Sequence, residues 1–404
     1  MARINENFLS LKKNYLFIEI AKRIREYTER DPENAKKIIR MGIGDVTLPI
    51  APAAVDAMKK AADEMGVKET FRGYEDSGAG YDFLREAVSG YYKSFGVSVP
   101  ASSIRINDGA KSDCGNITDI FGSDNTVLIT DPAYPVYVDT NIMSGRKIIY
   151  ADSNEGNGFA AMPDDSIHAD IIYLCSPNNP TGSAYTYDQL KRWIDYALKN
   201  EAVIIYDSAY EAFITDKNIP RSIYAVENAE YCAIEMCSLS KTAGFTGMRC
   251  GYTVIPEQLV MKASDGSSVS LAELWNRREG SKFNGVSYPV QRAAEAVFSP
   301  EGMAQTRKNI EYYQKNAEII SSALKSLSIP FTGGVNSPYI WLKCPDGADG
   351  WSFFDRMLTE IQVVGTPGEG FGKNGAGWFR LTSFNTHENT EEAMKRLSEV
   401  RSKK

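Results

Sequence analysis

The sequence has 404 residues, of which 43% are hydrophobic and 24% are charged, a composition typical of globular proteins. This length suits two or three domains of about 100–200 residues each. The net charge of −7 argues against a protein that binds nucleic-acid backbones. No apolar run approaches the roughly 18 residues that span a bilayer, and no signal peptide is visible, so we expect a cytoplasmic protein outside the membrane.

Cysteine and histidine usage narrows the chemistry further. Six cysteines are scattered without a CxxC pair, which favours reduced thiols over a disulfide scaffold or a zinc ribbon. The chain has only two histidines, His168 and His387. This scarcity argues against a histidine-rich metal site and against a Ser-His-Asp mechanism, so we expect no metal.

The predicted elements alternate between helices and strands. A first helix that stops at Asp31-Pro32 is predicted by apolar residues at helical spacing, namely Phe17, Ile20, Ile24 and Tyr27. Unbroken apolar runs then predict strands buried on both faces of a parallel sheet, at 126–130, 170–175, 202–206 and 250–255. A helical pattern at 186–199, with Leu190, Ile194 and Ala197 on one side, lies between two of these strands. Strand, helix and strand in succession are typical of an α/β sheet.

The last part of the chain predicts a second, smaller unit. A long helical stretch at 291–327 is followed by a break at 330–334 and by strand-like residues at 339–342 and 378–382. We interpret this part as an α+β domain. The predicted organisation is an N-terminal arm and helix at 1–45 that packs with the small domain, a large domain at 46–288 and a small domain at 289–404.

The most specific chemical motif runs from Ser238 to Gly251. Two serines, Ser238 and Ser240, precede Lys241. Arg249 follows eight residues later, and the stretch contains three glycines. A lysine amine can condense with a phosphorylated aldehyde, while hydroxyl groups and a guanidinium hold the phosphate. A single lysine in a polar loop is usually just solvated, but the whole string is far more specific.

Weaker signals follow other predicted strands, where ligands bind in open α/β sheets. Asp207 could pair with a protonated ring nitrogen and Tyr210 could donate to a ring oxygen, although an N-cap role for Asp207 has even odds. Asn179, in the segment 176–182, could present an amide, but this segment alone is read more simply as a turn. The turn at 107–113 offers backbone N–H groups to a phosphate or simply starts a helix. Tyr134 could cover a flat cofactor or belong to a surface turn.

Together and in this order, these motifs resemble the class I/II aminotransferases of fold type I, which depend on pyridoxal 5'-phosphate. The resemblance extends from about Tyr15 to Arg380. It implies an α/β fold in which helices sandwich a mixed, mostly parallel sheet in a large domain, beside a smaller α+β domain. A closer resemblance, to the LL-diaminopimelate aminotransferase family, is carried by the segments 5–7, 15–17, 42–47, 71–74, 108–116 and 282–286. That family interconverts tetrahydrodipicolinate plus glutamate and LL-2,6-diaminopimelate plus 2-oxoglutarate in lysine biosynthesis. The motif positions show no departure from it, whereas the stretch at about 152–166 looks short.

The resemblance also implies a role for each matched residue around the cofactor. Lys241 would form the internal aldimine and later move the proton between the substrate Cα and the cofactor carbon. Asp207 would pair with the pyridine nitrogen, and Tyr134 would stack on the ring. Tyr210 and Asn179 would bind the ring oxygen. The implied phosphate ligands are Ala110, Lys111, Ser238, Ser240, Arg249 and, from a neighbouring subunit, Tyr74.

The substrate side follows in the same way. The implied substrate-binding residues are Tyr15, Gly44, Lys111, Tyr134, Asn179, Asn284 and Arg380. Arg380 is the expected clamp for the α-carboxylate, since a guanidinium can hold a carboxylate through two bonds. Lys111 is a candidate for the second, distal carboxylate of both substrates. Tyr74 and Asn284 would come from the partner, which implies a homodimer with shared sites.

Of three alternatives to this function, only another reaction of the same cofactor remains open. A β-lyase, or an aminotransferase for aspartate or aromatic amino acids, would share Lys241, Asp207 and Arg380. A regulator with an aminotransferase-like domain would need a DNA-binding module, for which the chain has no room, and its charge is negative. A nicotinamide dehydrogenase is disfavoured because Gly42-Ile43-Gly44 is followed by Thr47 where the fingerprint requires a third glycine.

Overall fold

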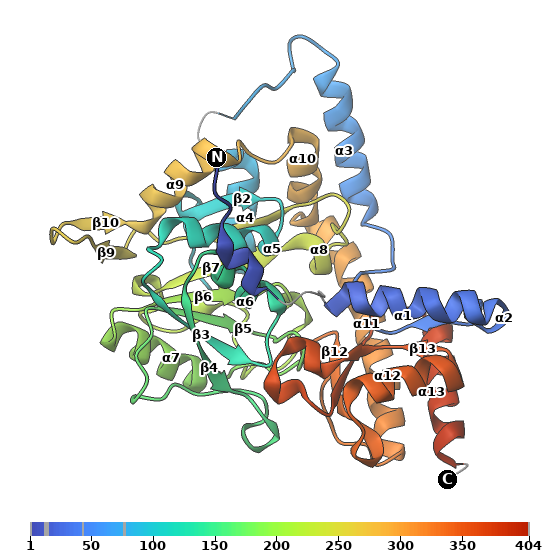
Figure 1. The fold of residues 1–404 in the computed structure, drawn as a ribbon. Coiled ribbons are helices and arrows are strands. Elements are labelled where there is room, and N and C mark those ends of the chain that lie inside the picture. Colours follow the sequence, from blue (N-terminus) through green and yellow to red (C-terminus); the bar gives the residue numbers. More distant parts are fainter. Residues whose placement is uncertain (1, 12–15, 43, 76–77, 403–404) are drawn as a thin grey trace.

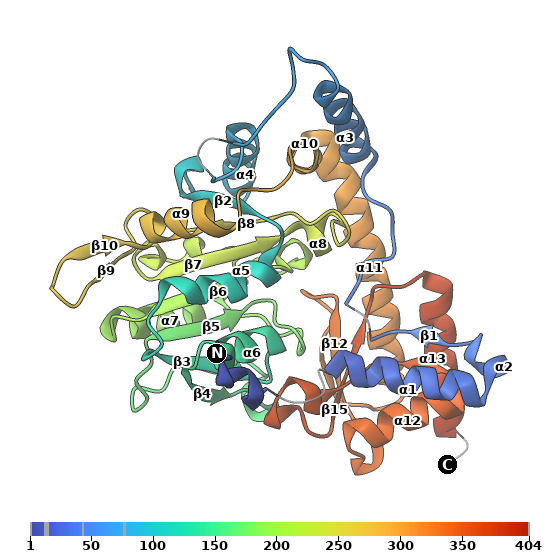
Figure 2. The same ribbon diagram turned by 45° about the horizontal axis from the view of Figure 1, so that its top comes forward.

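The computed structural model describes residues 2–11, 16–42, 44–75 and 78–402. A seven-stranded sheet occupies the middle of the chain and a four-stranded sheet belongs to its C-terminal part, as Figures 1 and 2 show. Helices cover both sheets, and the N-terminal helix lies on the C-terminal part. The predicted combination of a large α/β unit and a smaller α+β unit is therefore confirmed.

The large sheet has the strand order β2-β8-β7-β6-β5-β3-β4. Its strands are β2 (Ile104–Asn107), β3 (Thr126–Asp131), β4 (Lys147–Asp152), β5 (Ile171–Cys175), β6 (Val203–Asp207), β7 (Ala233–Ser238) and β8 (Gly251–Val254). All run in the same direction except β8, which is antiparallel to β2 and β7. The sheet is thus mixed and mostly parallel, as predicted. The prediction of a parallel strand at 250–255 is therefore wrong in direction, because burial on both faces produces an unbroken apolar run whichever way the strand points.

Helices flank this sheet on both faces. They are α3 (Pro52–Met65), α4 (Asp82–Ser94), α5 (Ala110–Asn116), α6 (Pro135–Met143), α7 (Tyr187–Lys199), α8 (Leu239–Thr242), α9 (Leu271–Lys282) and α10 (Tyr288–Val297). The start of α7 is a capping box, in which Thr186 and Gln189 satisfy each other's backbone N–H groups at 3.3 and 2.9 Å. The predicted inner face of this helix is completely buried. A hairpin of β9 (Val260–Lys262) and β10 (Ser268–Ser270) projects from the large sheet (Figure 1).

The small sheet is antiparallel, with the order β11-β12-β15-β14. Its strands are β11 (Phe331–Gly333), β12 (Tyr339–Lys343), β14 (Thr366–Pro367) and β15 (Trp378–Thr382), and its helices are α11 (Pro300–Ser326), α12 (Gly350–Ile361) and α13 (His387–Ser402). The helix predicted at 291–327 is two helices. Pro300 has no N–H with which to extend α10, and the Ser299 hydroxyl caps α11 by accepting the Gly302 N–H at 3.0 Å.

The helix and strand of the N-terminal segment pack with the small domain, whereas the arm before them, at residues 5–10, departs from the prediction and lies on α6 of the large domain, where the side chain of Asn5 donates to the Met143 carbonyl at 2.9 Å. Helix α1 (Leu16–Arg30) shares a hydrophobic core with α12 and the small sheet. After α2 (Pro32–Ala35), strand β1 (Ile39–Arg40) pairs in parallel with β13 (Val363–Val364). One detail of the predicted helix is wrong. Leu16, together with Ile20, Ile24 and Tyr27, forms the buried face, whereas Phe17 is only half-buried and faces the cavity described below.

No helix in the described part of the chain is both long enough and apolar enough to cross a bilayer.

Candidate active site

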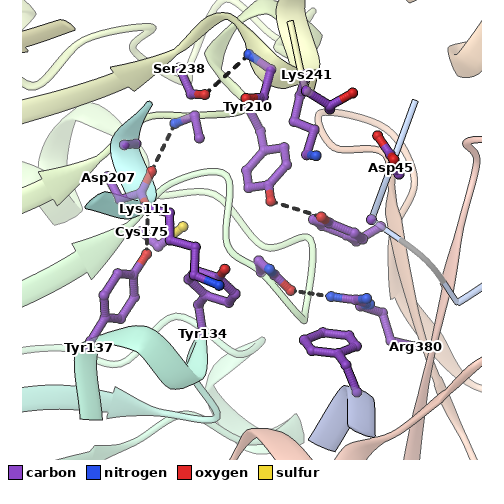
Figure 3. Close-up of a pocket in the computed structure, with 18 of the residues that line it drawn as sticks. Asp45, Lys111, Tyr134, Tyr137, Cys175, Asp207, Tyr210, Ser238, Lys241 and Arg380 are labelled. Atoms are coloured by element: carbon purple, nitrogen blue, oxygen red, sulfur yellow. Dashed lines mark hydrogen bonds between the residues drawn. The ribbon is translucent and has the colours of Figure 1, made fainter. Parts of the chain in front are cut away.

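A cavity of about 360 Å³ opens between the large and small domains, beyond the carboxyl ends of β5 and β6. Figure 3 shows side chains from both sheets pointing into it. It is lined by Phe17, Gly44, Asp45, Ala110, Lys111, Tyr134, Tyr137, Cys175, Asn179, Asp207, Ala209, Tyr210, Ser238, Ser240, Lys241, Thr246, Arg249, Tyr339 and Arg380. This is the place where open α/β sheets bind their ligands.

Lys241 enters the cavity from the short helix α8. The helix begins at Ser238, whose hydroxyl accepts the Ser240 N–H at 3.2 Å. Burial lowers the pKa of the Lys241 amine to about 8, with Arg249 and Arg380 acting in the same direction and Asp45 opposing them. An ordinary lysine has a pKa near 10.4 and is almost fully protonated at neutral pH. The cavity therefore contains a primary amine that is partly uncharged, and hence nucleophilic, near physiological pH.

Asp207 supplies a buried carboxylate at the end of β6. One of its oxygens accepts the Tyr137 hydroxyl at 2.6 Å, and the other accepts the Ala209 N–H at 3.0 Å. Burial raises the pKa of this carboxyl, while the bonds from Tyr137 and Ala209 limit the rise. A carboxylate in such a site is stabilised by a cationic partner in the cavity, such as a protonated ring nitrogen.

Arg380, on β15 of the small sheet, supplies a cation on the side of the cavity formed by the small domain. Its guanidinium donates to the side-chain oxygen of Asn179 at 2.6 Å and to the carbonyl of Gly42 at 2.7 Å. It lies over the rings of Tyr339 and Phe371, 4.5 and 4.9 Å from their centres. The side chain is only 1% exposed, yet it lines the cavity. A guanidinium fixed in this way can receive a carboxylate with little loss of side-chain entropy.

One end of the cavity forms a cradle suited to a phosphate. Helix α5 starts there after Gly109, and the Arg249 guanidinium donates to the Ser240 hydroxyl at 3.2 Å. Gly109 has a φ of +122°, and a Cβ at this position would lie 2.6 Å from Arg249 Nη2. The positive φ favours glycine here, and a Cβ would also displace this guanidinium. Backbone N–H groups, two serine hydroxyls and an arginine are the usual donors to a phosphate dianion.

Most of the residues predicted from the sequence meet in this cavity. They are Gly44, Ala110, Lys111, Tyr134, Asn179, Asp207, Tyr210, Ser238, Ser240, Lys241, Arg249 and Arg380. Tyr74 and Asn284 are exposed side chains outside its lining, with Tyr74 at 85% exposure. Tyr15 lies outside the described residues.

Sequence reasoning did not assign several residues of the lining. Tyr137 is one helical turn beyond Tyr134 and holds Asp207, and Cys175 ends a predicted strand. Tyr339 begins β12, beside the strand that carries Arg380. Asp45 directly follows Gly44. These residues could have been found from the sequence only by their position, at the end of a predicted strand or next to an assigned residue. Which side chain each of them contacts depends on the tertiary structure.

The family model described as aminotransferase class I and II matches residues 36–397, which include every residue of the cavity lining except Phe17. The chain belongs to the class I and II aminotransferase family. It is therefore a transaminase that depends on pyridoxal 5'-phosphate and has fold type I, as the sequence motifs predicted. The regulator and dehydrogenase alternatives fall away.

Similar proteins also agree with the closer resemblance. A protein named LL-diaminopimelate aminotransferase from Methanosphaera stadtmanae is 49% identical and covers 98% of this chain and 99% of its own length. One of the same name from Parabacteroides distasonis is 51% identical over the same shares. The solved L,L-diaminopimelate aminotransferase from Chlamydomonas reinhardtii is 39% identical, with a TM-score of 0.91 over 99% of this chain and 98% of its own. Thermus thermophilus aspartate aminotransferase, at 19% identity and a TM-score of 0.85, shares the fold.

The cavity fits the cofactor of this family. The amine of Lys241 can condense with an aldehyde, and the buried Asp207 carboxylate suits a protonated pyridine nitrogen. The glycine-lined cradle at the start of α5 leaves room where a phosphate needs backbone N–H groups. A primary amine, a buried carboxylate and a phosphate cradle within one 360 Å³ cavity match the three functional groups of pyridoxal phosphate.

Proposed function

We propose that this enzyme interconverts LL-2,6-diaminopimelate plus 2-oxoglutarate and tetrahydrodipicolinate plus glutamate, a step of lysine biosynthesis. The observation that carries the proposal is the similarity, at about half identity and across both domains, to proteins named LL-diaminopimelate aminotransferase. The cavity supports it, because cations at Arg380 and Lys111 suit substrates that carry two carboxylates.

For the cofactor, we assign the residues of the cavity as the motifs predict. Ala110 and Lys111 would give backbone N–H groups to the phosphate, beside Ser238, Ser240 and Arg249. Asp207 would hold the ring nitrogen, and Tyr210 and Asn179 the ring oxygen. Tyr134 would cover the ring. When bound, the cofactor supplies a carbonyl carbon that exchanges amino groups and a ring that withdraws electrons from the substrate Cα.

Lys241 would then have two duties. Its amine would hold the cofactor aldehyde in the resting enzyme, and once released by the substrate amine it would move the proton between the substrate Cα and the cofactor carbon. Both duties require an uncharged amine for part of the time, which the lowered pKa of about 8 provides. Aromatic side chains, among them Tyr134, Tyr210 and Tyr339, line the cavity that this amine enters.

For the substrate, Arg380 would clamp the α-carboxylate and Lys111 the distal carboxylate. Gly44, Tyr134 and Asn179 line the same space, and we retain Tyr15 as a substrate contact by resemblance. Lys111→Ala should weaken glutamate and diaminopimelate more than an amino acid with one carboxylate. Equal losses for all amino acids would remove the distal role of Lys111.

We also propose a homodimer with shared sites, in which Tyr74 and Asn284 reach the cavity of the partner. The support is their exposure in one chain and the neighbouring exposed ring of Phe71, since large apolar side chains on a surface often mark an interface. Mixing the inactive variants Lys241→Ala and Tyr74→Ala under subunit exchange should restore about a quarter of the activity, because half of the dimers then contain one complete site. No recovery would contradict shared sites.

Two further proposals rest on the overall organisation. We keep the division into 1–45, 46–288 and 289–404, supported by the large sheet at 104–254 and the small sheet at 331–382. Helix α10 follows the second boundary but packs against α3 and α4 of the large domain. A cytoplasmic location is supported by six buried cysteines, all of them free thiols.

The test of the proposed function is a visible spectrum of the holoenzyme, recorded while single amino acids are added. The panel is LL-diaminopimelate, its meso isomer, glutamate, aspartate and tyrosine. We expect the yellow band to bleach with LL-diaminopimelate and glutamate only. Bleaching with aspartate or tyrosine instead would leave the cofactor and the fold but overturn the substrate.

A further inference from the structure

Tyr339 contacts both the Tyr210 hydroxyl and the Arg380 guanidinium. Its hydroxyl lies 2.8 Å from that of Tyr210, an interaction drawn as the dashed line at Tyr210 in Figure 3. Its ring lies under Arg380, with 4.5 Å between the guanidinium carbon and the ring centre. Tyr339 belongs to β12 of the small sheet, whereas Tyr210 follows β6 of the large sheet.

The backbone of Tyr339 is placed by unusually close neighbours. A Cβ at Gly182 would lie 2.5 Å from the Tyr339 carbonyl oxygen, and one at Gly333 would also collide with it. Both glycines have φ near +70° to +80°, which favours glycine further. The loop that carries Asn179 therefore packs directly on the start of β12. On the other side, a Cβ at Gly44 would lie 2.9 Å from the Tyr339 hydroxyl. The side chain has little freedom to move.

We propose that Tyr339 is a positioning residue of the transamination reaction, acting through two neighbours at once: its hydroxyl orients Tyr210, and its ring supports Arg380. This inference rests on the roles proposed for Tyr210 at the cofactor and Arg380 at the substrate. A phenol that donates to the cofactor ring oxygen still has lone pairs, so Tyr210 can accept the Tyr339 proton while it donates its own. Hydrogen bonds in such a chain polarise one another, which makes Tyr210 a better donor.

The surroundings agree with neutral hydroxyls in both residues. Burial raises the pKa of Tyr339 and raises that of Tyr210 well above its usual range. The two rings meet edge to face, with 5.0 Å between their centres. This geometry leaves the face of the Tyr339 ring to the guanidinium, where cation–π attraction is strongest.

Two substitutions separate the two contacts. Tyr339→Phe removes the hydroxyl and keeps the ring, so we expect kcat to fall about three- to tenfold while the KM for the amino acid stays within about twofold. The visible band of the holoenzyme titrates with the nitrogen that joins Lys241 to the cofactor. Loss of that proton leaves the negative charge on the ring oxygen, which a weaker Tyr210 donor stabilises less, so the midpoint should rise by about half a unit to one unit. Tyr339→Leu removes both contacts and should also raise the KM about five- to thirtyfold.

Tyr196→Phe is the matched control, because it removes a buried hydroxyl on α7, bonded to the Ile167 carbonyl at 2.5 Å, away from the cavity. It should lower thermal stability without moving the titration or the KM. The inference is overturned if Tyr339→Phe leaves both kcat and the titration unchanged, or if it raises the KM as much as Tyr339→Leu does. All variants are assayed with whichever amino donor the wild type uses. A wild type that ignores LL-diaminopimelate would then overturn the proposed substrate and leave this test intact.

Discussion

The guanidinium of Arg380 and the side-chain oxygen of Asn179 are joined by a 2.6 Å hydrogen bond that crosses from the small sheet to a loop of the large sheet. The bond uses the amide oxygen of Asn179, so its NH₂ group is the part that can donate to the cofactor ring oxygen. One contact thus links the proposed carboxylate clamp to the proposed cofactor seat. A movement between the two domains at this point would therefore change the position of Arg380 and that of Asn179 together.

Arg380→Lys should raise the KM for the amino acid about a hundredfold, with a smaller fall in kcat. A lysine ammonium cannot bond a carboxylate, Asn179 and the Gly42 carbonyl in the same planar arrangement. Steady-state kinetics with glutamate measure this effect. The control is Arg221→Lys, which alters an arginine paired with Glu211 outside the cavity at 2.6 Å. An unchanged KM in Arg380→Lys, or an equal rise in the control, would speak against the clamp.

The lowered pKa of Lys241 predicts how the cofactor-free enzyme takes up pyridoxal phosphate. Only the uncharged amine reacts, so the uptake rate should rise through a midpoint near pH 8, far below that of an ordinary lysine. Asp45 favours the charged amine, and Asp45→Asn should therefore shift the midpoint downward. Stopped-flow absorbance gives both midpoints. A midpoint above pH 10 in the wild type, or an upward shift in the variant, would refute the assignment.

The phosphate cradle predicts that Gly109→Ala weakens cofactor binding by at least about tenfold. The new Cβ would lie 2.6 Å from Arg249 Nη2, and the φ of +122° strains any other residue. Gly96→Ala is a matched control, because Gly96 also has a positive φ, of +84°, but open space around it. Equilibrium dialysis should show weaker binding in the first variant only, whereas both should lose stability. Equal affinities would mean that the cradle does not hold the phosphate.

The sequence predicted the strands and most of the residues that line the cavity, but not the contacts that hold those residues in place. Apolar runs located β3, β5 and β6 to within a residue, because strands buried on both faces leave an unbroken pattern. The edge strand β4 carries half-buried and exposed residues and left no such run. The motif around Lys241 predicted an amine beside phosphate-binding groups, since its residue types lie close together in the sequence. Tyr137 and Tyr339 were missed because each acts on a residue 70 or more positions away, at Asp207 and Tyr210.

A buried carboxyl beneath the cradle predicts a specific pH dependence of stability. Asp113 accepts from Asn107 at 2.6 Å and from Thr253 at 2.5 Å, and burial raises its pKa from 3.8 to about 7. The folded state therefore holds this proton more tightly than the unfolded state does. Well below pH 4 the Asp113 carboxyl is protonated in the folded and the unfolded state and does not change the free energy of unfolding. As the pH rises to about 7, the unfolded state loses this proton first, and the free energy of unfolding falls progressively.

Asp113→Asn keeps an oxygen acceptor and does not titrate. Relative to wild type, the variant should gain about 3 kcal/mol between pH 4 and pH 7, measured by urea unfolding. Asp119→Asn should behave in the opposite way. Although partial burial acts against it, hydrogen bonds from Lys282 and Arg278 keep the pKa of Asp119 lowered, so its stabilising effect is present above pH 4. If the stability of Asp113→Asn relative to wild type fell, or stayed constant, between pH 4 and pH 7, the raised pKa of Asp113 would be contradicted.

Turnover of LL-diaminopimelate with 2-oxoglutarate by the purified holoenzyme, followed as glutamate formed, tests the proposed function itself. We expect a kcat/KM for LL-diaminopimelate at least about a hundredfold above those for aspartate and tyrosine, because Lys111 is proposed to bind the distal carboxylate, which tyrosine lacks and aspartate holds nearer its α-carbon. The activity should disappear in Lys241→Ala. A comparable or higher kcat/KM with aspartate or tyrosine would contradict the account.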